Sequence, residues 1–221
     1  MADPRALTPL EARIVGVLVE KQATVADSYP LSLNALVMGC NQKTAREPVI
    51  NATEAEVMAT LDSLKLLSLV VEFSGSRVSR YEHNLKRVLA VPGQSIAILT
   101  LLMLRGPQTA AELRANTERL HRFADISSVE GFLDELARRE PTLVVKLPRA
   151  PGAREPRWAQ LLCGPVDMTA MASQAGPDDF VAAGEIAALK AEQGRMAAEL
   201  ADLRALVVRM AGELGIDPGQ R

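Results

Sequence analysis

Side chains that act as nucleophiles, general bases or metal ligands are few in this chain. Among 221 residues there are two cysteines, Cys40 and Cys163, and two histidines, His83 and His121. These four are not spaced like a zinc-ligand set. The chain also lacks a Gly-x-Ser-x-Gly elbow and a glycine-rich phosphate loop. We therefore expect no bound metal, no cofactor and no enzymatic activity.

Cationic side chains offer a different chemistry, the binding of phosphates or of acidic partners. They collect in the expected connectors and hairpins, positions from which a protein orients itself on a nucleic acid without reading its bases. An ordinary solvated surface is the alternative explanation. Our candidate nucleic-acid or partner-binding residues are Asn41, Lys43, Arg46, Arg77, Arg80, Arg122, Arg149, Arg154 and Arg157.

The secondary-structure elements that would carry these residues form a sequence repeat. Residues 69–73 read LVVEF and residues 143–147 read LVVKL. Capping boxes, Thr53-x-x-Glu56 and Ser127-x-x-Glu130, precede the two segments. The second copy has a competing cap at Asp125. Each segment is followed by a turn and a second strand-like run, at residues 77–82 and 157–162.

Helix-start signals complete the two copies. Thr8-Pro9, Ser32 and Thr53 open three helices in the first, and the third of these runs to about Leu66. In the second copy, one helix starts near Ser95 and stops at Gly106-Pro107, and Thr109-x-x-Glu112 opens the next. The predicted fold is mainly α with small β-hairpins, an α+β class. It consists of two tandem winged helix-turn-helix domains at residues 1–90 and 91–164.

The remainder of the sequence has a different pattern. Residues 165–181 form a linker in which Pro, Asp, Gly, Ser and Ala together dominate. From residue 182 to 215 a heptad pattern predicts an amphipathic coiled-coil helix. The alternatives are a single amphipathic helix docked on its own domains and a frayed tail. The candidate dimerisation residues on the heptad core positions are Ile186, Leu189, Gln193, Met196, Leu200, Leu203, Val207 and Met210.

Composition limits the functions that remain. The net charge is −2, which is unlike a strongly basic DNA-binding protein. Aromatic residues make up 3% of the chain, too few for a platform that stacks single-stranded bases. The two cysteines lie far apart and in no C-x-x-C arrangement, which favours a reducing compartment. With no signal peptide and no long apolar run, we expect a cytoplasmic protein without a membrane span.

Four stretches carry a resemblance to a known family. Residues 29–43 (YPLSLNALVMGCNQK) and 75–83 (GSRVSRYEH) lie in the first half, and residues 119–125 (RLHRFAD) and 147–152 (LPRAPG) lie in the second. They resemble the motifs of the YceH-like family of bacterial proteins. The resemblance implies a tandem pair of winged helices and carries over no catalytic or ligand-binding residue. It directs attention to Asn41, Lys43, Arg77 and Arg80, which we predict to share one binding surface.

Two functions fit this sequence. The first is a transcription-regulator-like protein that binds double-stranded DNA as a homodimer joined by the C-terminal helix. The expected third helices count against it, because they carry carboxylates such as Glu54, Glu56, Glu130 and Asp134 where phosphates would lie. The second is a winged-helix module that binds another protein and makes no direct contact with DNA. The fold alone does not decide between the two.

Overall fold

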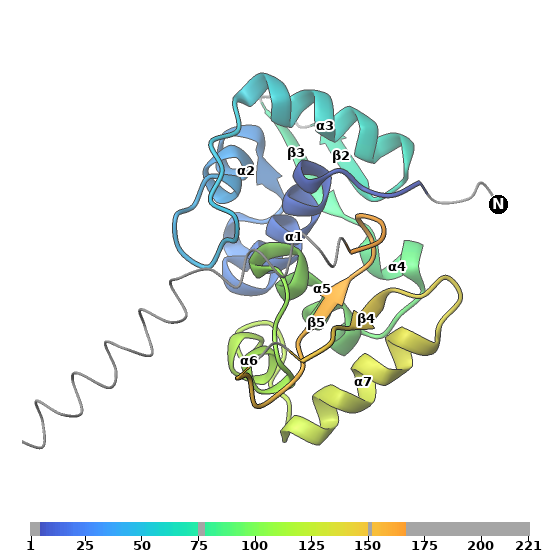
Figure 1. The fold of residues 1–221 in the computed structure, drawn as a ribbon. Coiled ribbons are helices and arrows are strands. Elements are labelled where there is room, and N and C mark those ends of the chain that lie inside the picture. Colours follow the sequence, from blue (N-terminus) through green and yellow to red (C-terminus); the bar gives the residue numbers. More distant parts are fainter. Residues whose placement is uncertain (1–4, 75–77, 150–151, 167–221) are drawn as a thin grey trace, which may run out of the picture. The chain divides into compact units, whose positions relative to one another are not determined.

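Seven α-helices and two small antiparallel sheets make up the part of the chain that the structure describes (Figure 1). The structure is a computed structural model, and it describes residues 5–74, 78–149 and 152–166. The class is mixed α and β, as the α+β prediction required. The predicted coiled-coil segment, with all its candidate dimerisation residues, lies outside the described residues.

The first half contains three helices and a three-stranded sheet. A short 3-10 helix, Ala26–Ser28, follows the first helix. In the sheet, β3 lies in the middle and pairs with β1 and β2, with Leu31 opposite Tyr81 and Glu72 opposite Tyr81 on its other side. The elements are α1 (Pro9–Thr24), β1 (Leu31–Ser32), α2 (Leu33–Cys40), α3 (Glu54–Leu66), β2 (Val70–Ser74) and β3 (Ser79–His83).

The second half repeats this order after a short helix, α4 (Leu85–Leu89). Its two-stranded sheet pairs Val144 with Gln160 and Lys146 with Trp158. An isolated bridge between Gln108 and Trp158 occupies the place that β1 has in the first half. The elements are α5 (Gly93–Arg105), α6 (Ala110–Asn116), α7 (Ile126–Arg138), β4 (Val144–Lys146) and β5 (Trp158–Gln160).

Helix caps account for most of the predicted boundaries. The capping boxes at Thr8, Thr53 and Thr109 are all formed, with both hydrogen bonds present in each. The predicted box at Ser127 is wrong. Asp125 caps α7 instead, because its carboxylate accepts a hydrogen bond of 2.7 Å from the Ser128 backbone N–H. The helix therefore begins two residues before the predicted box would allow.

The strands agree with the sequence pattern to within one or two residues, but short elements such as β1 and α4 were not predicted. β1 has only two residues and merges into the cap of α2, so it shows no alternation of apolar and polar side chains. α4 has only five residues and lacks a side-chain cap. Both elements lie below the length at which periodicity becomes visible in a sequence.

Helix α1 is the centre of the packing and joins the two halves. Its residues 11–19 are buried, and it packs against α2, α3 and β3 as well as against α5. Two glycines permit close approach: a Cβ on Gly16 would lie 2.9 Å from the Leu104 side chain of α5, and a Cβ on Gly39 would lie 2.6 Å from Val17. One continuous apolar core therefore runs through both halves. The predicted boundary at residues 90 and 91 stays a prediction.

Candidate nucleic-acid or partner interface

Asn41 has a structural task in the connector between α2 and α3. Its Oδ1 accepts a hydrogen bond of 2.7 Å from the Ala52 backbone N–H, and its Nδ2 donates one of 2.8 Å to the Ala52 carbonyl. This pair of bonds closes the loop formed by residues 41–52. An amide used on both its oxygen and its nitrogen has little left to offer a ligand.

Arg46 is buried, at 4% exposure, and so is not available to an external partner. Its Nη2 lies 2.6 Å from a Glu20 carboxylate oxygen, and its Nε donates to the Gly39 carbonyl at 3.2 Å. Burial opposes ionisation of Glu20, but the hydrogen bonds and charge of Arg46 still hold the pKa of Glu20 below its ordinary value. Arg46 therefore fastens the connector to α1 and α2.

A second buried arginine supports the same loop. Arg13 of α1 donates to the Cys40 carbonyl at 3.1 Å and to the Pro48 carbonyl at 2.6 Å. Cys40 is also buried there, and burial raises the pKa of its thiol to about 12. A thiol that stays protonated is a poor nucleophile. The described residues contain no cluster of His, Cys, Asp or Glu that could hold a metal ion.

The surface that was predicted to contain Asn41, Lys43, Arg77 and Arg80 has fewer side chains free to bind a partner, because intramolecular hydrogen bonds occupy some of them. Arg80 is exposed, but its guanidinium donates to the Pro30 carbonyl at 2.7 Å. Lys43 is exposed and makes no hydrogen bond or ion pair with any described residue. Arg77 lies outside the described residues. Lys43 is thus the member of the set that the described structure leaves available.

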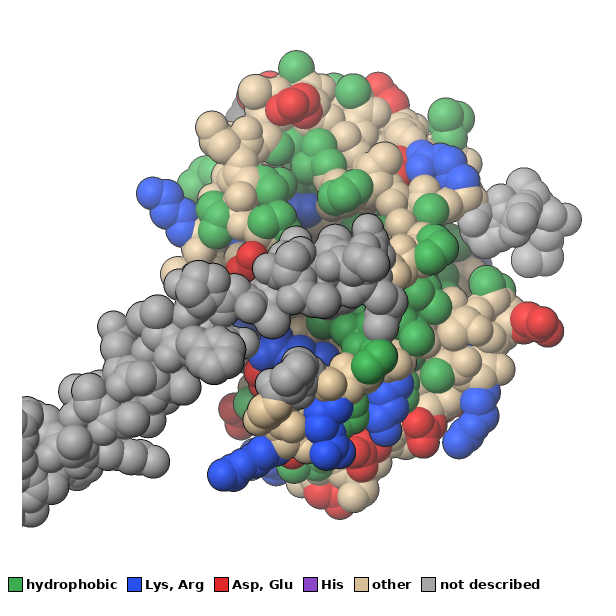
Figure 2. Space-filling model, viewed as in Figure 1, with side chains coloured by type: hydrophobic (Ala, Val, Ile, Leu, Met, Phe, Trp, Pro, Cys, Tyr) green, Lys and Arg blue, Asp and Glu red, His purple; other side chains and the backbone are tan. Residues whose placement is uncertain are grey.

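The second half presents its arginines differently. Arg122, Arg149 and Arg154 are exposed and make no hydrogen bond or ion pair within the described ranges. Arg157 anchors the base of the second hairpin, with its Nη2 3.5 Å from a Glu112 carboxylate oxygen on α6. Figure 2 shows Lys and Arg side chains gathered on the half of the molecule that contains α6, α7, β4 and β5. Arg122, in the α6–α7 connector, and the arginines of the second hairpin therefore remain candidates for binding DNA or a partner.

The outer faces of α3 and α7 are acidic, as the sequence predicted. Ion pairs balance part of this charge: Lys65 Nζ lies 2.8 Å from Asp62, and Arg138 lies 3.7 Å from Asp134. Both pairs lie at the surface, where screening makes such contacts weak. The exposed carboxylates of the two helices are Glu54, Glu56, Asp62, Glu130, Asp134 and Glu135.

An apolar face on the first sheet was missed by the sequence analysis. Val71 and Phe73 on β2 are 38% and 48% exposed, and Val78, just before β3, is 55% exposed. Val71 and Phe73 share one face because strand residues alternate, and Val70 points into the core. The sequence does contain apolar residues here, at 69–71 and at 73. Which of them faced out depended on the register.

His83 ends β3 between α1 and α4. Its Nε2 is 2.8 Å from the Gln22 side-chain oxygen, and its backbone N–H donates to the Tyr29 hydroxyl at 2.8 Å. Its Nδ1 is buried and has no partner among the described residues. Burial lowers the pKa of His83 to about 4, so the ring is neutral at pH 7.

This histidine predicts a stability loss on mild acidification. An unfolded histidine titrates near 6.5, whereas folded His83 titrates at about 4. Its contribution is therefore complete above pH 6.5 and is lost as the pH falls toward 4, because the unfolded chain then binds the extra proton. We expect the loss to be about 1–3 kcal/mol, allowing for the partial exposure of the ring. Urea unfolding at pH 7, 6 and 5 measures it.

The control for this prediction is the other histidine of the chain. His83→Gln should flatten the dependence on pH between 7 and 5, and His121→Gln should retain it. Glu11 does not interfere, because its hydrogen bond with Arg5 lowers its pKa to about 2, and the stability that it contributes is lost only as the pH falls below 4.5 toward 2. An unchanged pH profile in His83→Gln would disprove the assignment.

Comparison with known proteins places the chain in a family. The family model described as a protein of unknown function, DUF480, matches residues 7–153. A UPF0502 protein of Methylibium petroleiphilum is 72% identical over 214 residues, which cover 96% of this chain and 92% of the relative. A UPF0502 protein of Burkholderia multivorans is 69% identical over 214 residues, which cover 96% of this chain and 91% of the relative. One of Burkholderia pseudomallei is 65% identical over 216 residues, which cover 98% of this chain and 92% of the relative.

The described residues define an α+β protein of helices and small antiparallel sheets. The chain belongs to the UPF0502 family of bacterial proteins that the DUF480 model describes, which confirms the resemblance to the YceH-like family. No helix within the described ranges combines the length and the apolar character that a membrane crossing requires.

Proposed function

We propose that both halves are winged-helix domains. The order of three helices followed by a hairpin occurs in each half. In each, a short segment between the first two helices pairs with the last strand, Leu31 with Tyr81 and Gln108 with Trp158. That pairing supports a winged-helix assignment more strongly than the element order alone.

The function that this geometry supports best is the binding of double-stranded DNA through its phosphates. The observation that carries the proposal is the set of exposed arginines that have no partner among the described residues, Arg122 between α6 and α7 and Arg149 and Arg154 in the second hairpin. These side chains occupy the α6–α7 connector and the wing, which suit backbone contacts. The acidic face of α7 disfavours base reading in the major groove. We therefore propose binding that depends little on DNA sequence.

The test is fluorescence anisotropy with a random-sequence duplex at 50 and 200 mM salt. Each phosphate neutralised contributes about 0.9 to the slope of log affinity against log salt concentration. The triple variant R122A/R149A/R154A should therefore weaken binding and reduce the slope by about 3. The control K86A/R87A removes two exposed cations from the first half and should keep the slope. No binding of the full chain at 50 mM salt would reject the proposal.

A second function, binding of a protein partner, is favoured by one specific observation. The first sheet exposes apolar side chains at Val71, Phe73 and Val78. Burying them against a protein would stabilise a complex, whereas DNA phosphates gain nothing from an apolar surface. If the duplex does not bind at low salt, this alternative takes precedence. The proposed homodimer through residues 182–215 is a separate matter. Sedimentation of the full chain against residues 1–170 tests it, and a monomeric full chain at tens of micromolar contradicts it.

A further inference from the structure

The outer face of the first sheet is fixed by the register of its strands. Tyr81 of β3 is buried, and Leu31 of β1 and Glu72 of β2 lie directly opposite it. Successive residues of a strand point to opposite faces, so Arg80 and Glu82 point away from the core. The Arg80 side chain is exposed, and that of Glu82 is partly exposed.

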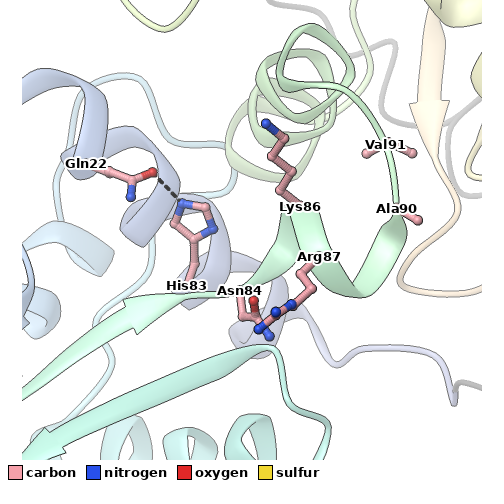
Figure 3. Close-up of a pocket in the computed structure, with 7 residues that line it drawn as sticks. All are labelled: Gln22, His83, Asn84, Lys86, Arg87, Ala90 and Val91. Atoms are coloured by element: carbon pink, nitrogen blue, oxygen red, sulfur yellow. Dashed lines mark hydrogen bonds between the residues drawn. The ribbon is translucent and has the colours of Figure 1, made fainter.

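The end of β3 gives the same orientation. Figure 3 shows His83 turned toward α1, where a hydrogen bond of 2.8 Å joins its ring to the Gln22 side chain. Glu82 comes directly before His83 in the strand, so its side chain points to the side of the sheet away from α1. The Glu82 carboxylate therefore lies on the face that solvent reaches.

Four side chains cover this outer face as two neighbouring pairs. Val71 of β2 lies opposite Glu82 of β3, and Phe73 of β2 lies opposite Arg80 of β3. Val71 and Phe73 are 38% and 48% exposed. The face thus carries an apolar row along β2, and beside it a row along β3 with one positive and one negative charge.

Neither charge has an ionic partner within the described ranges. Glu82 makes no side-chain hydrogen bond or ion pair with a described residue. Arg80 uses its Nη1 for the Pro30 carbonyl at 2.7 Å and the Ser28 carbonyl at 3.4 Å, while its Nε and Nη2 have no partner among those residues. The two residues are about 7 Å apart along the strand, and they form no ion pair with each other.

This arrangement makes the outer face complementary to itself. Consider a two-fold axis that runs parallel to the face, perpendicular to the strands and midway between the two pairs. It places Arg80 over Glu82 of a second copy, and Glu82 over Arg80 of that copy. The same axis places Val71 over Phe73 of the second copy, so apolar side chains meet apolar side chains. A single operation satisfies both rows, as a closed dimer requires.

We propose that the outer face of the first sheet binds a second copy of the chain, with the two sheets packed face to face about this axis. Packed sheets lie about 10 Å apart, a space that side chains from both sheets fill. Burial of the apolar row supplies affinity, and the opposite charges set the register. The strands are short and the buried area is small, so we expect a weak complex with a Kd in the micromolar range or above.

Pairing at the free edge of β2 is the less favourable arrangement. β2 is the last strand of the sheet, and its outer edge offers backbone groups to an added strand. The antiparallel register that sets Val71 beside Phe73 of a second copy also sets Glu72 directly opposite Glu72 of that copy. Like charges in directly opposite positions destabilise a sheet. Edge pairing would also leave Arg80 and Glu82 without partners.

The experiment is sedimentation velocity of the full chain at low salt, from about 10 µM to about 1 mM. The mass of the wild type should rise with concentration. Arg80→Glu and Glu82→Arg should each weaken this association at least tenfold, because each substitution places like charges together at two symmetric contacts. The double variant R80E/E82R restores both ion pairs with their signs exchanged, so its affinity should return to within about threefold of the wild type.

The apolar row is tested in the same way. V71S/F73S should weaken association, whereas Met38→Ser, at a side chain 69% exposed on α2, should not. Association through residues 182–215 would be equal in all these proteins, so the differences between them measure the sheet contact alone.

Three results would overturn the proposal. They are a wild-type chain that stays monomeric, equal association in the wild type and both charge reversals, and a double variant as weak as the single ones. A face that binds a different protein would give one of the first two. Arg122, Arg149 and Arg154 are unchanged in every variant, so affinity for the random duplex tests the proposed function separately.

Discussion

Replacing Arg46 by alanine is expected to lower the free energy of unfolding by about 3–5 kcal/mol. The substitution would leave the Glu20 carboxylate half-buried without its partner at 2.6 Å. It would also leave the Gly39 carbonyl without the hydrogen bond from Arg46 Nε. Removal of one member of a buried ion pair costs far more than the pair contributes in the intact protein, because the remaining charge is stranded.

Lys43→Ala is the matched control, three residues away in the same connector. Lys43 is exposed and unpaired among the described residues, so its removal should change stability by less than about 0.5 kcal/mol. Urea unfolding of both variants at pH 7, followed by circular dichroism, gives the comparison. Equal, small effects in the two variants would mean that Arg46 is a surface residue after all. Glu20→Gln should destabilise too, because it leaves Arg46 without a counter-ion.

Leu36→Ala is expected to destabilise both halves together by about 2–5 kcal/mol. Leu36 on α2 is fully buried in the first half, and truncation of a buried leucine leaves a cavity in a close-packed core. The apolar core is continuous from α2 through α1 to α5. We therefore expect the second half to lose the same stability although no atom in it has changed.

The chain provides a local reporter for this test. It has one tryptophan, Trp158, which lies buried on β5 in the second half. In urea unfolding, Trp158 fluorescence and far-ultraviolet circular dichroism should move to the same lower midpoint in Leu36→Ala. Met38→Ala on the same helix, at a side chain 69% exposed, should leave both midpoints in place. A Trp158 transition that stays at the wild-type midpoint would show that the halves unfold separately.

The sequence predicted those features that depend on near neighbours in the chain. Capping boxes such as Thr8 with Glu11 place their donors and acceptors three residues apart, so the pattern can be read without the fold. The start of α7 was ambiguous, because two candidate caps two residues apart, Asp125 and Ser127, satisfied the local rule. In the structure, the Asp125 carboxylate accepts the Ser128 backbone N–H and the helix takes the earlier start.

The candidate site was harder to predict because it depends on burial. Asn41 and Arg46 lie in a polar connector, which in a sequence indicates a solvated loop. The structure instead uses them to satisfy backbone groups that belong to distant positions, Ala52 and Gly39 among them. Nothing in residue type separates such an arginine from Arg122 or Arg154. The difference lies in the carbonyls and carboxylates that the fold brings to it.

The central position of α1 has a consequence for synthesis of the protein on the ribosome. The first half is made first, yet the face of α1 around Gly16 is covered by Leu104 of α5. The segment before α1 obtains its hydrogen-bond partner even later, because the Leu7 backbone N–H donates to the Leu162 carbonyl at 2.7 Å. A nascent chain of about 90 residues thus carries an uncovered apolar helix face until α5 has emerged. We expect such a chain to need a chaperone or rapid translation of the next residues.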